Sequence, residues 1–254
     1  MLKKYIIKDD NNDFTFDTLS DGVNFENIIV GRKGANIGDI TKDKIPIVRT
    51  TSTYRNPNQK FSDKHYKLIE EIQKQSDIPD IILNNALIEI YDNRYCRMGF
   101  HTDQELDLKE NSYICIFSCY KNPNTKNFRS LIFKDKITNK EDNRIILDNN
   151  SVVIFSTQFN EQHLHKIMLE KRINSDINDD SEWLGITFRL SKTFIRFIDK
   201  YPYFCNSIQQ LRFATYTERN LFINYKSQEN KLCSFKYPII NYTINPGDLI
   251  RPKL

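Results

Sequence analysis

The segment IILNNALIEIY (Ile81–Tyr91) decides the fold that we predict for this chain of 254 residues. From Ala86 to Ile90 every second side chain is apolar, and the residues between them include the carboxylate of Glu89. An alternation with a period of two residues is typical of a β-strand that turns one face toward a core. We therefore predict a strand in this segment.

Short β-prone runs continue after this segment, and polar loops rich in Asn, Asp and Lys, such as 121–127 and 174–181, separate them. Many short strands between polar turns indicate a sandwich or barrel rather than an alternating α/β fold. The predicted fold class is therefore mainly β with flanking helices (α+β), with a sandwich or barrel at its centre. The further predicted strands are Tyr113–Cys119, Ser130–Lys134, Arg144–Leu147, Val152–Ser156, Lys166–Leu169 and Leu184–Leu190.

One helix is predicted before the strands. Ser62 is a good N-cap residue, and Phe61 before it can act as a hydrophobic staple. His65, Leu68 and Ile72 follow at the spacing of one helical face. We therefore predict that His65 packs against the core and does not bind a metal.

Both ends of the chain differ from this β-rich middle. Residues 1–45 are polar and irregular, and Thr217 opens a predicted short helix in the tail. We predict three parts. They are an N-terminal extension (1–79), a β-rich core (80–192) and a C-terminal extension that packs on the core (193–254).

The composition narrows the class of protein without deciding its function. The 5 cysteines are scattered and form no CxxC pair, which indicates a reducing, intracellular compartment, cytoplasmic or nuclear. No run approaches the roughly 20 apolar residues of a membrane helix, so we predict no membrane partner, and we predict no signal peptide. A net charge of +4 is compatible with a nucleic-acid partner and with an ordinary soluble protein alike. The sequence carries no information on the oligomeric state.

Three of the four histidines lie where a metal site would need them. His101 and Asp103 form an HxD pair, and residues two apart in an extended segment point the same way. A histidine from a later strand, either His163 or His165, would complete a triad of two imidazoles and one carboxylate. Such a triad leaves adjacent metal positions open, which is typical of non-haem iron(II) oxygenases. A zinc site made from the same histidines is the alternative, and the carboxylate fits it less well.

A cation follows this constellation in the sequence. The segment 185–189 is a predicted strand that ends in Arg189. A guanidinium binds a carboxylate through two parallel hydrogen bonds. The order HxD, then histidine, then arginine therefore favours an oxygenase that takes the dicarboxylate 2-oxoglutarate.

In this order and spacing the motifs resemble the core of the AlkB-like dioxygenases over about residues 80–192. The resemblance implies a double-stranded β-helix (jelly-roll) core and the use of iron(II), 2-oxoglutarate and O2. It also implies oxidation of a carbon on the substrate, often an N-methyl group of a nucleobase, while 2-oxoglutarate loses carbon dioxide. The matching segments are Asn85–Tyr91, Met98–Glu105, Ile116–Ser118, Leu131–Lys134, His165–Ile167 and Ile186–Arg189.

The resemblance implies that His101, Asp103 and His165 bind the iron. His165 is preferred because the family's second histidine precedes a short polar–aliphatic pair, which residues 166–167 supply. His163 remains the alternative.

Further residues are implied for the cosubstrate. Tyr91 matches a tyrosine that hydrogen-bonds 2-oxoglutarate in the family, and Arg189 matches the second of two family arginines. Two positions depart from the family, since Trp183 stands in place of the first arginine and Glu89 in place of an asparagine. Arg189 would then hold the cosubstrate, alone or with help from Ser191, Lys192 or a hydroxyl such as that of Thr187, or the anchoring differs from that of the well-studied family members.

Candidate substrate contacts lie on both sides of the predicted core boundary. Glu105 matches an acidic position that touches the substrate base in some family members. In the family the region before the core supplies a lid over the substrate, so the resemblance implies a substrate lid in the extension 1–79 that precedes the dioxygenase core. In this predicted lid, Arg49 and Arg55 are expected to contact phosphates while Tyr54 stacks on a base. The alternatives are an ordinary exposed carboxylate for Glu105 and an ordinary β-prone segment for the lid.

The leading functional hypothesis is an oxygenase that hydroxylates or oxidatively demethylates a nucleobase in DNA or RNA. A base in a duplex would have to be flipped out of the stack to reach the iron. Hydroxylation of a protein side chain on the same fold is the second hypothesis. A catalytically inactive binding module is the third, and Trp183 is the residue that supports it.

Overall fold

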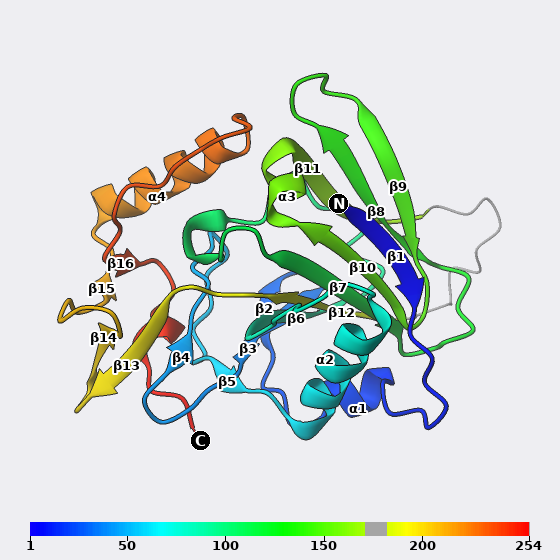
Figure 1. Cartoon of the computed structure of the whole chain (residues 1–254), viewed down its shortest axis with the longest axis horizontal. Helices are drawn as coiled ribbons and strands as arrows, with labels where there is room; N and C mark the ends of the chain where they lie inside the picture. Colours follow the sequence, from blue (N-terminus) through cyan, green and yellow to red (C-terminus); the bar gives the residue numbers. More distant parts are fainter. Residues whose placement is uncertain (171–181, 254) are drawn as a thin grey trace.

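Two β-sheets packed against each other form the centre of the molecule, as Figure 1 shows for the computed structural model. The structure describes residues 1–170 and 182–253, so the predicted loop 174–181 lies outside the described residues. The strands are β1 (Leu2–Ile6), β2 (Glu26–Ile29), β3 (Arg32–Gly38), β4 (Ile45–Pro46), β5 (Gln59–Lys60), β6 (Asn85–Tyr91), β7 (Tyr113–Tyr120), β8 (Arg129–Asp135), β9 (Glu141–Leu147), β10 (Ser151–Ser156), β11 (His163–Leu169), β12 (Trp183–Arg189), β13 (Phe194–Ile198), β14 (Tyr201–Phe204), β15 (Arg212–Phe213) and β16 (Tyr242–Thr243). The helices are α1 (Phe16–Ser20), α2 (Asp63–Gln75), α3 (Thr157–Gln162) and α4 (Tyr216–Glu229), with short 3-10 turns at Glu105–Asp107 and Pro246–Leu249.

The larger sheet has the strand order β1-β10-β7-β12-β6-β3-β2, and β5 pairs with β3 at its side. The smaller sheet has the order β11-β8-β9. A cluster of buried side chains joins the facing surfaces of the two sheets, with Phe133 on β8 and Ile167 on β11 meeting Phe155 on β10. Two facing antiparallel sheets with these crossovers form a jelly-roll, and the predicted fold class is confirmed.

The strands predicted from hydrophobic alternation are all present, with small shifts at their ends. The first begins at Asn85 and not at Ile81, because the chain passes through a left-handed residue at Asp80 and enters the sheet only after Asn84. The smaller sheet also extends further than predicted, since β11 begins at His163.

The N-terminal segment differs from the expectation that residues 1–45 are irregular. It contributes β1, β2 and β3 to the larger sheet, and β1 pairs along its whole length with β10. Both β1 and β2 lie at sheet edges and are half exposed. An edge strand of this kind needs little apolar alternation, so the hydrophobic pattern alone did not reveal it.

Helices α1 and α2 lie side by side against the larger sheet, at the lower right in Figure 1. Ser62 caps α2, and the side chain of His65 completes the capping box. The other ring nitrogen of His65 lies 3.0 Å from the carbonyl oxygen of Leu19 on α1. His65 is therefore a buried packing residue, as predicted.

The C-terminal segment forms a separate layer beside the two sheets. Strands β14, β13 and β4 form a small sheet, and β15 pairs with β16 in parallel. The helix predicted at Thr217 is α4, which begins at Tyr216 and extends for 14 residues. In Figure 1 it crosses the upper left of the molecule, far from α1 and α2. Within the described residues no helix is long and apolar enough to span a membrane.

Trp183, the first residue of β12, is buried in the hydrophobic cluster between the two sheets. Its indole nitrogen donates a hydrogen bond to the Ser118 hydroxyl at 2.5 Å, and the ring lies directly over Gly185. A Cβ atom added at Gly185 would stand 2.0 Å from a ring carbon of Trp183. Only glycine therefore leaves room for the indole in this position.

We expect Gly185→Ala to lower the free energy of unfolding by about 1–3 kcal/mol, because the indole must shift inside a packed core. Urea denaturation measures the change. Gly99→Ala is the matched control, since a Cβ atom at Gly99 would meet nothing within 4 Å. Equal losses in both variants would contradict the close approach of the indole.

Candidate active site

The three predicted metal ligands meet between the two sheets. His101 and Asp103 lie on the segment that follows β6, and His165 lies on β11. The backbones of His101 and His165 exchange two hydrogen bonds, of 3.0 and 2.7 Å, and this pairing places their side chains together. One ligand atom from each of the three side chains lies within 4.8 Å of the others, so the group could hold a metal ion.

Neighbouring groups orient His101 and Asp103 by hydrogen bonds. The Nδ1 atom of His101 lies 3.0 Å from the carbonyl oxygen of Gly99, which leaves Nε2 free. The Oδ2 atom of Asp103 accepts a hydrogen bond of 2.8 Å from Arg189 Nε, while Oδ1 lies 3.7 Å from His165 Nε2. The Nδ1 atom of His165 is buried and has no hydrogen-bond partner. Such fixed orientations are what supporting residues provide at metal centres.

The ionisation of the three side chains suits a bound cation. Burial lowers the pKa of His165 to about 3, and the adjacent His101 acts in the same direction. Burial also lowers the pKa of His101. Burial alone would raise the pKa of Asp103, but Arg189 and the two imidazoles hold it well below its usual range. Neutral imidazoles and an ionised carboxylate are the forms that bind metal ions.

His163 lies outside this group. Its ring nitrogens are 2.9 Å from the carbonyl oxygen of Phe159 and 3.0 Å from a carboxylate oxygen of Asp142. Its ring also stacks on Phe159, with 3.8 Å between the ring centroids. Of the two histidines that the sequence left as alternatives, the structure therefore brings His165 to the other two side chains.

Helix α4 supports the segment that carries His101 and Asp103. Lys226 donates hydrogen bonds to the carbonyl oxygen and the hydroxyl of Thr102, at 2.6 and 2.7 Å. The side-chain oxygen of Asn230, at the end of α4, accepts from the backbone nitrogen of Thr102 at 3.0 Å. On the other side, Asn160 exchanges two hydrogen bonds with the backbone of Asp103. Sequence reasoning missed these supports, because nothing in the local pattern of α4 shows which loop it contacts.

A cavity of about 90 Å³ opens beside the three side chains. Tyr91, Thr187 and Arg189, the three predicted cosubstrate contacts, all line it. The cavity is also lined by charged and polar side chains that the sequence analysis had not assigned to it, among them Arg32, Glu89, Gln104 and Lys226, and by residues 50–52 of the predicted lid.

One of the unexpected groups is a carboxylate held by two donors. Arg32 on β3 binds Glu89 on β6 through Nε at 2.7 Å and Nη2 at 2.5 Å. The Tyr91 hydroxyl donates to the other oxygen of Glu89 at 2.6 Å. The sequence analysis treated residues 1–45 as irregular and so missed Arg32 on β3. The signal that could have identified this strand is the apolar alternation of Ala35 and Ile37.

The four predicted substrate contacts are placed as follows. Arg55 is exposed, and its role stays a prediction. Glu105 does not line the cavity beside the metal group; it lines a larger neighbouring cavity of about 630 Å³, together with Glu161. Burial and the nearby carboxylates raise the pKa of Glu105 to about 8.

The expectations for Arg49 and Tyr54 need correction. Arg49 is 3% exposed, forms an ion pair with Asp107, and donates to the carbonyl oxygens of Ile240 and Tyr242. Tyr54 is 1% exposed and packs over Gly34. Neither side chain reaches the surface, so Arg49 is not available to a phosphate and Tyr54 does not stack on a base in this conformation.

Comparison with known proteins gives a family and a structural likeness. The family described as the 2OG-Fe(II) oxygenase superfamily matches residues 35–189. A solved structure titled "The structure of OsALKBH1" is similar with 12% sequence identity and a TM-score of 0.38, over 63% of this chain and 78% of that chain. No curated protein matches the sequence.

Proposed function

We propose that this chain, which belongs to the 2OG-Fe(II) oxygenase superfamily, oxidises a nucleobase of DNA or RNA, at a carbon such as that of an N-methyl group. The chain is a dioxygenase that uses iron(II), 2-oxoglutarate and O2. The nucleobase is the proposed part, and a buried side chain with unused hydrogen-bonding groups beside the metal group supports it.

The donor set fits iron(II). Two imidazoles and one carboxylate are available within 4.8 Å, and the buried Nδ1 of His165 shows that the imidazole is not consumed by other contacts. We assign His101, Asp103 and His165 as the ligands. Held by these residues, iron(II) together with the cosubstrate would supply the oxidation of a C–H bond of the substrate by O2.

The remaining task of the chain is to orient the ligands and the cosubstrate. Arg189 holds Asp103 by one oxygen, which leaves the other oxygen for the metal. Lys226 fixes the loop between the ligands from the side of α4. Tyr91, Thr187 and Arg189 line the cavity beside the metal group, and we assign them to the cosubstrate.

The observation that supports a nucleobase is that the buried carboxamide of Gln104 makes no hydrogen bonds. Its side chain is 4% exposed and lines the cavity next to Asp103, yet neither its amide nitrogen nor its amide oxygen has a hydrogen-bond partner. A buried donor and acceptor left unpaired cost about 1–3 kcal/mol each. A base edge that offers one acceptor and one donor, as adenine does, pairs with a carboxamide through two hydrogen bonds.

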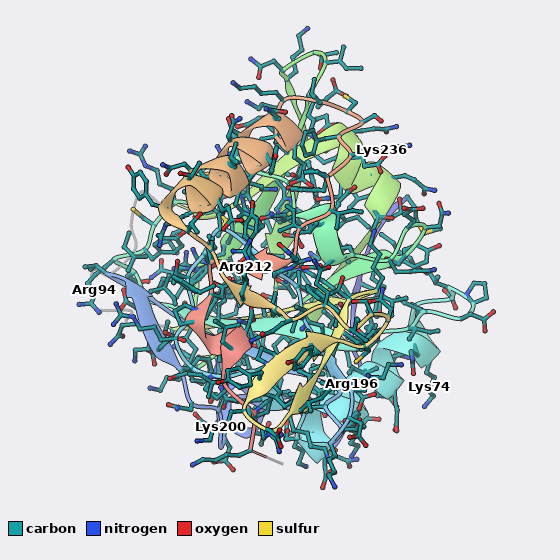
Figure 2. The ribbon with its side chains drawn as sticks, turned by 90° about the vertical axis from the view of Figure 1, so that its left-hand side faces the viewer. Lys74, Arg94, Arg196, Lys200, Arg212 and Lys236 are labelled. Carbon is teal, nitrogen blue, oxygen red and sulfur yellow. The ribbon has the colours of Figure 1, made fainter. Side chains whose placement is uncertain are left out.

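The surface charge is compatible with a polyanion. Figure 2 shows the face that carries α4 and β13 to β15, from which the labelled side chains of Arg196, Lys200, Arg212 and Lys236 extend. Arg212 is paired with Glu218, whereas the other three labelled side chains of this face have no carboxylate partner among the described ion pairs. Lysine and arginine side chains of this kind bind phosphates without reading the sequence.

We expect Gln104→Leu to lower kcat/KM for a methylated oligonucleotide by about 10- to 100-fold, since a bidentate contact discriminates by about 1–3 kcal/mol. Formaldehyde release and mass spectrometry of digested nucleosides measure the reaction. Iron(II) affinity is the internal control and should not change, because leucine keeps the bulk of the side chain while the three ligands stay in place.

A panel of methylated single-stranded DNA, RNA and duplexes identifies the base. Activity that falls steeply with added salt supports a nucleic-acid substrate, because phosphate contacts release counterions. Product on a peptide panel with none on oligonucleotides would replace this proposal by the hydroxylation of a protein side chain. Full oligonucleotide activity in Gln104→Leu would contradict the proposal that the Gln104 carboxamide hydrogen-bonds the substrate base.

A further inference from the structure

Arg32 occupies the same cross-strand row as Trp183. The register of the larger sheet pairs Trp183 with Tyr91 on β6, and it pairs Tyr91 with Arg32 on β3. Side chains directly opposite each other in neighbouring strands point to the same face of a sheet. A cation is thus present in this row, two strands away from the indole of Trp183.

Arg32 and Tyr91 already bind a carboxylate, that of Glu89. The guanidinium holds one oxygen at 2.5–2.7 Å, and the Tyr91 hydroxyl holds the other at 2.6 Å. A charge-assisted pair of this kind, with both oxygens bound, is a strong carboxylate contact in proteins. We call this arrangement the carboxylate clamp: Arg32 and Tyr91 as donors, Glu89 as the group they hold.

The other cations that line the cavity have their own partners. Arg189 binds Asp103, and Lys226 binds Thr102 together with Glu229. Lys226 therefore supports the segment that carries the metal ligands, and Arg189 supports Asp103 as well as the cosubstrate to which it is assigned above. Among the described cavity-lining residues, Arg32 is the cation whose partner, Glu89, is neither a ligand nor a support of the ligand segment.

The cavity is too small for a ligand while Glu89 lies in the clamp. Its volume of about 90 Å³ is well below the roughly 300–1,000 Å³ of typical ligand sites. A further hydrogen-bonding group is also available at this end. The Tyr54 hydroxyl is buried without a partner and lies over Gly34, which pairs with Glu89 in the register of β3 and β6.

We propose that Arg32 and Tyr91 bind the carboxylate of 2-oxoglutarate that lies away from the metal, and that Glu89 occupies this clamp as an internal competitor until the cosubstrate displaces it. The inference rests on the iron and cosubstrate site assigned above and is independent of the nucleobase. Release of Glu89 enlarges the cavity at the same time as it frees both donors.

The test is calorimetric titration of the full chain loaded with Mn(II), which replaces iron(II) without turnover. Two probes are used: 2-oxoglutarate, and 2-oxovalerate, which has the same 2-oxo acid end but lacks the second carboxylate. The variants are Glu89→Gln, Arg32→Met and Tyr91→Phe, each checked by thermal melting.

Glu89→Gln removes the competing charge and keeps the size of the side chain, so it should tighten 2-oxoglutarate binding by about tenfold or more and change 2-oxovalerate binding by less than about threefold. Arg32→Met should weaken 2-oxoglutarate binding by about 30-fold or more, because a buried charge pair is lost, and should spare 2-oxovalerate. Tyr91→Phe keeps the ring and should weaken 2-oxoglutarate binding selectively even where Arg32→Met does not fold.

Two outcomes would overturn the inference. If Arg32→Met binds 2-oxoglutarate as tightly as the unchanged chain, the carboxylate clamp does not bind the distal carboxylate of 2-oxoglutarate. If Arg32→Met does not fold, unchanged binding in Tyr91→Phe gives the same conclusion. Weaker binding in Glu89→Gln would show that Glu89 holds Arg32 in position and does not compete. Failure of the metal site itself is separate from both, because it would appear as loss of Mn(II) binding in the unchanged chain.

Discussion

Replacing His165 by alanine will weaken iron(II) binding by more than about 100-fold, because changes outside the ligand set alone typically cost 10–100-fold. The same replacement at His163 will leave the affinity within about threefold, since His163 binds Asp142 and stacks on Phe159 away from the metal group. The two histidines share one strand, β11, which makes His163→Ala a matched control.

Anaerobic titration with iron(II) and 2-oxoglutarate measures this difference through the metal-to-ligand charge-transfer absorbance, and succinate release in air follows. The band should appear in the unchanged chain and in His163→Ala and be lost in His165→Ala. The reverse pattern would place the third ligand at His163. Absence of the band and of succinate in the unchanged chain would remove the assigned metal site.

Replacing Arg49 by methionine is expected to lower the free energy of unfolding by about 3–5 kcal/mol, because it leaves a buried carboxylate without its partner. The Asp107 side chain is fully buried and receives hydrogen bonds from Arg49 at both oxygens. Arg49 also donates hydrogen bonds to the carbonyl oxygens of Ile240 and Tyr242, so the variant also loses two contacts with the C-terminal segment.

Arg55→Met is the control for this experiment, since the Arg55 side chain is exposed and its loss should change stability by no more than about 0.5 kcal/mol. Urea denaturation of both variants gives the stability, and oligonucleotide binding gives the contact with phosphate. A stable Arg49→Met variant with weakened oligonucleotide binding would contradict the structural role and restore the original expectation of a phosphate contact.

The sequence by itself determined the features that depend on neighbouring residues. The alternation around Ile88 predicts β6, and Ser62 predicts the start of α2, because strand faces and helix caps repeat over a few residues. The order of His101, Asp103 and Arg189 predicted a group that could hold a metal and one of its supports through the resemblance to a known family, and not through a local pattern, since Asp103 and Arg189 are 86 residues apart.

The tertiary structure alone decided which side chains those features meet. The sequence presents Arg49 as a free cation, and only the fold pairs it with Asp107. The sequence likewise shows no partner for Glu89, and only the fold places Arg32 of β3 beside it. Lys226 reaches the metal segment from a helix far along the chain. Such partners are separated by 57 to 124 residues, and no local pattern records them because the distance between them is set by the packing of whole sheets.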